Sequence, residues 1–172
     1  MPVDIRLPVG DGGCDVFALG AAGIIVEGSR LLMVTNDEVD YWYSVGGAVE
    51  FGESTREALA REIREELGAD LEVGDLAAVE ESFFSPVEER TGGRRASHTW
   101  HQVTLSYWVD VPNGFDPVAR STASHGEEER LGWLSAGDLA AGVTVFPVFF
   151  KDVLDGRWPG VRHYVERSGR YV

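Results

Sequence analysis

Three glutamates that lie close together are the residues of this chain best suited to chemistry. Glu62, Glu65 and Glu66 belong to the stretch GGAVEFGESTREALAREIREELG, residues 46–68. At ~100° per residue of a helix, their carboxylates fall on one arc. Like charges three or four residues apart cost about 0.2–0.5 kcal/mol per pair on a helix. Such a cluster requires a function or a partner that offsets the repulsion.

A divalent metal ion is one explanation for this acidic arc. An apolar stripe of Leu59, Ile63 and Leu67 adjoins the carboxylates, which predicts that they lie at a packed boundary. Gly46 and Gly47 precede the helix and let the backbone turn closely and present carbonyl oxygens. Carboxylate and carbonyl oxygens are hard ligands that suit Mg²⁺ or Mn²⁺. The alternative is a solvated acidic face, the usual meaning of a charge run.

The helix that must position these carboxylates has distinct predicted ends. Ser54, followed three residues later by Glu57, is a capping-box pattern, and Gly68 is typical of a helix C-terminus. Before the helix, residues 18–27 and 30–35 are apolar and rich in β-branched side chains, which predicts a hairpin packed on both faces. Residues 41–45 are predicted as a further short strand.

The second half of the chain mixes strands and helices. We predict extended structure over 71–84 with a turn near 74–75, a polar hairpin loop over 85–97, and a half-buried strand over 100–111 from its period of two. A long irregular segment covers 113–130. A strand over 131–134, a short helix capped by Ser135, an amphipathic helix with Pro147 in its first turn, and a C-terminal hairpin follow. This order predicts one domain over 1–172, an α/β layered sandwich with a mixed β-sheet.

The spacing of glycines and charges in this stretch resembles the Nudix box. Every glycine and charged position of that 23-residue motif is filled between residues 47 and 69, by Gly47, Glu53, Arg61, Glu62, Glu65, Glu66 and Gly68. The chain departs from the family pattern at Ala69, where a bulky aliphatic residue is usual, and at Val45, where a proline often stands. Neither departure removes a charged group.

The resemblance implies a Nudix-type α/β/α sandwich and metal-dependent hydrolysis of a diphosphate linkage. The implied substrate is a nucleoside diphosphate derivative: a nucleotide, a nucleotide sugar or a compound of the ADP-ribose type. The implied metal ligands are Glu62, Glu65, Glu66 and the carbonyl of Gly47. An ion pair of Arg61 with Glu53 is implied to aim these glutamates.

A non-catalytic alternative is a Nudix-like domain that binds and senses a nucleotide derivative. Such domains usually lose glutamates of the box, and none is lost here.

The general base and the substrate contacts are less strongly encoded. Glu66 is one candidate base, and the acidic run 127–129, centred on Glu128, is the other, with a solvated turn as the alternative for the run. Tyr41, Tyr43 and Phe84 could stack on a base, or pack in the core. Arg94 could meet a phosphate, or lie at a solvated loop tip.

Composition restricts the partners. The formal charge of −14 repels nucleic acid and anionic lipid, so we expect neither an extended nucleic-acid interface nor a membrane partner. No apolar run reaches the ~20 residues that span a bilayer. The single cysteine, Cys14, suits a reducing compartment. We expect a cytoplasmic protein that acts on a small molecule, and we consider a homodimer as its assembly.

Overall fold

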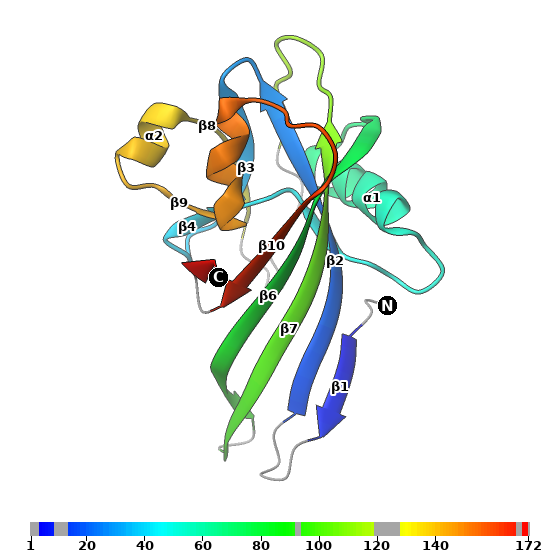
Figure 1. Cartoon of the computed structure of the whole chain (residues 1–172), viewed down its shortest axis with the longest axis vertical. Coiled ribbons are helices and arrows are strands. Elements are labelled where there is room, and N and C mark those ends of the chain that lie inside the picture. The colour runs from blue at the N-terminus through cyan, green and yellow to red at the C-terminus, as the bar shows by residue number, and fades with distance from the viewer. Residues whose placement is uncertain (1–3, 9–13, 92–93, 119–127, 168–169, 172) are drawn as a thin grey trace.

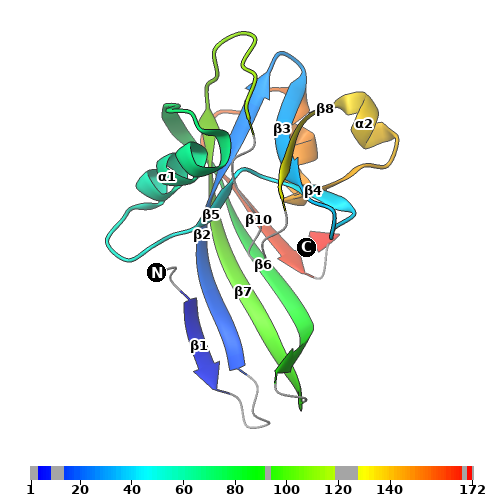
Figure 2. The same cartoon turned by 180° about the vertical axis from the view of Figure 1, so that it is seen from behind.

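The computed structural model describes residues 4–8, 14–91, 94–118, 128–167 and 170–171 (Figure 1). Side chains are described for 15–84, 99–118 and 128–167. Two helical segments, α1 (Thr55–Leu67) and the 3₁₀ helix η1 (Val148–Asp155), flank a curled sheet on opposite sides (Figures 1 and 2). A short helix, α2 (Ala136–Ala140), lies on the η1 side.

The strands form one mixed sheet. They are β1 (Asp4–Pro8), β2 (Cys14–Glu27), β3 (Arg30–Thr35), β4 (Tyr41–Tyr43), β5 (Gly46–Ala48), β6 (Val73–Thr91), β7 (Arg94–Val109), β8 (Arg130–Ser135), β9 (Thr144–Phe146), β10 (Arg162–Arg167) and β11 (Arg170–Tyr171). The main order is β11-β10-β6-β7-β2-β3-β4-β9, while β1 and β5 pair with β2, and β8 pairs with β3. Parallel pairs (β2 with β7, β6 with β10, β4 with β9) occur among antiparallel ones, which confirms the predicted mixed sheet.

Helix α1 begins and ends as predicted. The Ser54 hydroxyl accepts a hydrogen bond from the backbone N–H of Glu57, and the Glu57 carboxylate accepts one from the backbone N–H of Ser54. Gly68 ends the helix with φ of 62°, a left-handed conformation that glycine adopts without strain. These local caps fix which residues of the helix face the sheet.

Strands β2 and β3 are packed on both faces, as predicted. Ile25 and Leu32 belong to a core beneath α1, while Ile24 and Leu31 belong to a second core beneath η1. All four side chains are fully buried because successive residues of a strand point to opposite faces. The chain is thus anchored on both sides just before it reaches the glutamates of α1.

Several boundaries in the second half differ from the predictions. Residues 85–91 and 94–97 are strand and not loop, since β6 and β7 pair as far as Thr91 and Arg94. Backbone hydrogen bonds form this ladder irrespective of side-chain polarity, so composition alone was misleading. The predicted turn near 74–75 is a shift of register inside β6. Strand β7 is buried on both faces near its end, because Trp108 packs in the η1 core.

The predicted last helix is the 3₁₀ helix η1, and the C-terminal hairpin is confirmed as β10 and β11. In the described residues, no helix is long and apolar enough to cross a membrane. The single domain over 1–172 stays a prediction.

Candidate active site on helix α1 and the adjoining cavity

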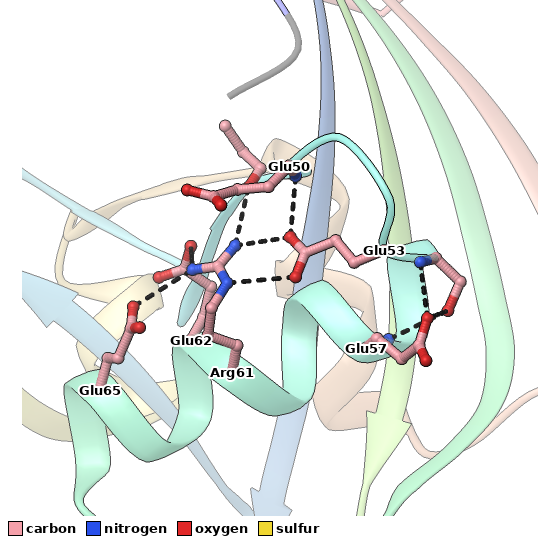
Figure 3. Close-up of polar contacts among 8 residues, drawn as sticks. Glu50, Glu53, Glu57, Arg61, Glu62 and Glu65 are labelled. Atoms are coloured by element: carbon pink, nitrogen blue, oxygen red, sulfur yellow. Dashed lines mark hydrogen bonds and ion pairs between the residues drawn. The ribbon is translucent and has the colours of Figure 1, made fainter. Parts of the chain in front are cut away.

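Arg61 lies at the centre of the acidic arc and uses all five of its N–H groups. Nε and Nη2 donate to the two carboxylate oxygens of Glu53 at 3.2 and 2.8 Å, a bidentate pairing. Nη2 also donates to the carbonyl oxygen of Ala48 at 3.1 Å. Nη1 donates to Glu62 at 2.7 Å and to Glu65 at 3.2 Å. Figure 3 shows this network between the helix and the preceding loop.

The network holds the loop before the helix. Oε1 of Glu53 accepts a hydrogen bond from the backbone N–H of Glu50 at 2.8 Å, in addition to that from Arg61. The bond from Arg61 lowers the pKa of the Glu53 carboxyl. The predicted ion pair of Arg61 with Glu53 is therefore present in the structure, while its function in aiming the glutamates stays a prediction.

Glu66 lies in a different environment on the same helix. Its residue is only 9% exposed, and Oε1 accepts a long bond of 3.4 Å from the backbone N–H of Gly46. Oε2 is buried and has no hydrogen-bond partner. Burial, and then the negative charges of Glu129 and Glu62, raises the pKa of Glu66 to about 9. No cation in the described residues compensates this group in the way that Arg61 compensates Glu62.

The glycines allow the backbone to approach the acidic helix. Gly46 has φ of 139°, and a β-carbon there would collide with the carbonyl oxygen of Ala21 in β2. A β-carbon on Gly47 would collide with the carboxylate of Glu62. A larger residue at position 47 would therefore displace the Glu62 carboxylate, whereas glycine brings the backbone of β5 against both Glu62 and Glu66.

The donor set fits a divalent cation, although it is not assembled as a cage. Among the described residues, no three His, Cys, Asp or Glu side chains converge closely enough to hold a metal ion. Glu62 and Glu65 are turned toward Arg61, whereas the orphaned oxygen of Glu66 lacks a positive partner. Oxygen donors of this kind suit hard cations such as Mg²⁺. The assignment of Glu62, Glu65, Glu66 and Gly47 as metal ligands stays a prediction.

A cavity of about 830 Å³ opens next to Gly46 and Gly47. The predicted substrate residues Tyr41, Tyr43 and Phe84 all line it. The ring of Tyr41 meets Phe146 edge-on, with centroids 5.1 Å apart. The structure describes the backbone of Arg94 but not its side chain, so its contact with a phosphate stays a prediction.

The acidic run contributes a neighbour of the predicted base. Glu129 lines the cavity, and its Oε1 accepts a hydrogen bond of 2.6 Å from the Tyr43 hydroxyl. Glu128 is exposed and is not among the lining residues, while residue 127 lies outside the described part. Adjacent residues of an extended chain point to opposite sides, and nothing in three consecutive glutamates indicates which one turns inward.

Sequence analysis missed the polar floor of the cavity. Glu80, Ser82, Gln102, Thr104 and Glu166 line it from β6, β7 and β10. No alternation marks them in β6, because Glu81 stands between Glu80 and Ser82, and the contribution of β10 depends on a parallel pairing across more than 80 residues of sequence.

The curled mixed sheet between helical segments, with a glutamate-rich helix beside a cavity, is the arrangement of a Nudix domain. A family model described as NUDIX domain matches residues 17–151. The chain therefore belongs to the Nudix family, and the predicted class of enzyme, a Nudix hydrolase, is confirmed.

Individual relatives agree with this membership. The chain is 37% identical over 84 residues to the CTP pyrophosphohydrolase of Escherichia coli K12, covering 46% of this chain and 58% of that protein. It is 29% identical over 103 residues to the dihydroneopterin triphosphate diphosphatase of the same strain, covering 48% and 69%. The crystal structure of a MutT protein from Bacillus halodurans has the same fold, with a TM-score of 0.57, 18% identity and coverage of 90% and 94%.

Proposed function

We propose that this protein hydrolyses a diphosphate linkage in a nucleoside diphosphate derivative, with a divalent cation held by the glutamates of α1. The observation that carries the proposal is the state of Glu66. A glutamate that is nine-tenths buried, has one oxygen without a partner and lies near two other glutamates is unfavourable in its charged form unless a cation joins it. Both named relatives are, by their names, enzymes that cleave diphosphate linkages of triphosphates.

Each residue of the box has a proposed function. Glu62, Glu65, Glu66 and the carbonyl of Gly47 hold Mg²⁺ or Mn²⁺. When bound, the cation supplies positive charge against the diphosphate and lowers the pKa of water in the site. Arg61 balances the carboxylates that face it and, through Glu53, holds the loop of residues 49–53 against the helix. Arg61 and Glu53 are thus positioning residues.

Glu66 and Glu129 are the candidates for the general base. Glu129 lines the cavity, and Glu66 accepts a hydrogen bond from Gly46 at its edge. Without a cation, burial raises the pKa of Glu66 to about 9, so Glu66 holds a proton near neutral pH; it could serve as a base only when a bound cation lowers that pKa. Tyr43 orients Glu129 through a hydrogen bond of 2.6 Å. Glu129 takes the place of the predicted base Glu128 in this proposal, because Glu129 lines the cavity and Glu128 does not.

The cavity is the proposed place of the rest of the substrate. Tyr41, Tyr43 and Phe84 give it aromatic walls on which a heterocycle can stack. The substrate is proposed to be a small molecule, and a cytoplasmic location and a homodimer are kept as parts of the proposal. The alternative of a sensor domain without turnover predicts binding but no product.

The test is a screen of nucleoside triphosphates, nucleotide sugars and dinucleotides with Mg²⁺, with chromatographic detection of products. We expect diphosphate cleavage of at least one compound, abolished by exhaustive chelation and restored by added Mg²⁺. Full activity after chelation would contradict the metal site, and tight binding without product would favour the sensor domain.

A further inference from the structure

The floor of the cavity has a chemical character that the box does not explain. Neighbouring strands place Glu80, Ser82 and Phe84 of β6 beside Gln102 and Thr104 of β7, all facing the cavity. The register pairs Ser82 with Gln102, and Glu80 with Thr104. On the other side of β6, Glu166 of β10 pairs with Ser82. These polar side chains therefore form a patch on one face of the sheet.

Two of these floor residues are carboxylates with almost no exposure to solvent. Glu80 is 3% exposed and Glu166 is 2% exposed, yet both line the cavity. They lie diagonally across β6 and β10, since Glu80 pairs with Tyr164, two residues before Glu166. Diagonal neighbours on one face of a sheet are within reach of the same ligand group when their side chains are long.

The charge of the cavity decides which end of a substrate can enter it. The described lining residues include four glutamates, at positions 38, 80, 129 and 166, and no lysine, arginine or histidine. Glu80 and Glu166 would repel phosphate groups, so we place the phosphates at the Gly47 end beside the helix, where the proposed cation would offset the charge of Glu129. The deep part suits an uncharged aromatic group that donates hydrogen bonds.

Small residues on β2, the strand that pairs with β7, leave room for such a group next to the polar floor. Ala18, Gly20 and Ala22 line the cavity, as do the aromatic residues Tyr41 and Phe146. A cavity of about 830 Å³ is within the range of about 300–1,000 Å³ that is typical of small-molecule sites. A flat heterocycle can lie against the aromatic wall with its edge toward the floor.

We propose that Glu80 and Glu166 recognise a heterocycle with the 2-amino-4-oxo edge that guanine and pterins share. Carboxylate oxygens accept hydrogen bonds from N–H donors. This edge presents a ring N–H and an exocyclic amino group side by side, so it offers two adjacent donors to the two acceptors. The inference rests on the proposed function for the position of the phosphates, but the recognition itself requires no hydrolysis.

The other common bases match this floor poorly. Cytosine and adenine place a bare ring nitrogen, an acceptor, next to their amino group, and two acceptors facing each other repel. Uracil offers a single ring N–H between two carbonyl oxygens. Hypoxanthine keeps the ring N–H of guanine but lacks the amino group, which makes it the matched probe for this contact.

The test is calorimetric binding of GMP, IMP and CMP, which contain no diphosphate linkage and are not consumed. The titrations are made with chelator and again with Mg²⁺. A good pair of hydrogen bonds to a base edge discriminates by about 1–3 kcal/mol, so we expect GMP to bind about tenfold or more tightly than IMP and CMP. Equal affinities, or tighter binding of CMP, would overturn the proposal.

Variants assign the preference to the floor. Glu166→Gln and Glu80→Gln keep the shape of the side chain, and each is expected to reduce the GMP-to-IMP ratio to within about threefold of one. Glu38→Gln removes an exposed carboxylate of the same cavity and is expected to leave the ratio unchanged. If both floor variants fold and retain the full ratio, the assignment is wrong. If they do not fold, the ligand series on the unchanged protein still decides the preference.

Hydrolysis assays distinguish a guanine substrate from a pterin substrate. They also test the recognition by Glu80 and Glu166 separately from the proposed hydrolysis. GTP and dihydroneopterin triphosphate are compared at equal concentration, and the larger kcat/KM identifies the guanine or the pterin source. Cleavage of all triphosphates without preference for this edge would overturn the recognition and leave the proposed function intact. Preferential binding of GMP without cleavage of any triphosphate would support the recognition and overturn the proposed hydrolysis.

Discussion

The two ends of the acidic arc on α1 carry the same kind of side chain in opposite states. Around Arg61, three carboxylates and a carbonyl oxygen receive five N–H donors, so each of these acceptor groups has a hydrogen-bond partner within the chain. One turn further along, Glu66 is buried with an unpaired oxygen. The first arrangement resembles a structural clamp. The second is an incomplete site, stable only when a proton or a cation is supplied from outside.

The difference shows how a stable fold can tolerate an unfavourable group. The fixed caps of α1 and the Arg61 network hold the helix in place, so Glu66 cannot move to solvent to relieve its burial. Helix α1, the loop before it and β5 thus hold the Glu66 carboxyl group, with its unpaired oxygen, in a position where a ligand can bind it.

The largest expected effect comes from Glu66→Gln, which removes the charge from the incomplete end. We expect hydrolysis to fall by orders of magnitude, because the substitution removes both a metal ligand and a candidate base. Steady-state rates with saturating Mg²⁺ measure this. Glu72→Gln, which removes one charge from an exposed position, is the control. Equal turnover in both variants would make Glu66 a structural residue only.

The balanced end is tested by Arg61→Lys. Lysine has three donors for the five acceptors that Arg61 serves, so the glutamates lose part of their orientation. Loss of such supporting contacts typically reduces metal affinity or activity about 10–100-fold, and we expect turnover to fall by that factor in protein that remains folded. Arg64→Lys alters an exposed arginine on the same helix, paired only loosely with Asp70 at 3.6 Å, and should have little effect. Normal turnover in folded Arg61→Lys would contradict the positioning function.

The pH dependence of stability distinguishes the two ends without substrate. The pKa of Glu66 is raised to about 9 in the folded chain from 4.5, so between these values the folded state holds a proton that the unfolded state has released. Stability is then fully present below about pH 4.5 and is lost as pH rises toward 9. We expect the chelated protein to lose about 1 kcal/mol or more of unfolding free energy between pH 6 and 9.

Urea unfolding at these pH values measures the loss, and Glu66→Gln serves as the reference because it cannot titrate. The same slope in both proteins would show that other groups cause it.

The smallest effect is expected from Ser54→Ala, which weakens α1 as a whole. Loss of an N-cap costs about 1 kcal/mol of stability, and both ends of the arc should be affected alike. The comparison is Ser135→Ala, which removes the equivalent cap from α2. If Ser54→Ala reduces turnover far more than it reduces the folded fraction, the cap contributes to the geometry of the site.

Sequence predicted the features of this site that depend on local rules. The caps at Ser54 and Gly68 and the periodicity of α1 follow from neighbours within four residues, so the helix and the arrangement of its glutamates were predictable. The both-face packing of β2 and β3 was likewise visible in their continuous apolar character.

The features that were not predicted depend on long-range pairing. Glu166 reaches the cavity because β10 adds to β6 in parallel, and no short-range pattern encodes that choice. Glu129, and not Glu128, turns inward because of the strand that follows it. The strands over 85–91 and 94–97 were predicted as a loop because their polar composition conceals a regular backbone ladder.

The most direct test of the incomplete site is a calorimetric melt of the unchanged protein and of Glu66→Gln, each with chelator and with Mg²⁺. A ligand that binds only the folded state raises its stability, so Mg²⁺ should raise the melting temperature of the unchanged protein. In chelator, Glu66→Gln should be no less stable than the unchanged protein, and it should respond much less to Mg²⁺. Equal Mg²⁺ shifts in the two proteins, or no shift in either, would contradict the claim that Glu66 awaits a cation.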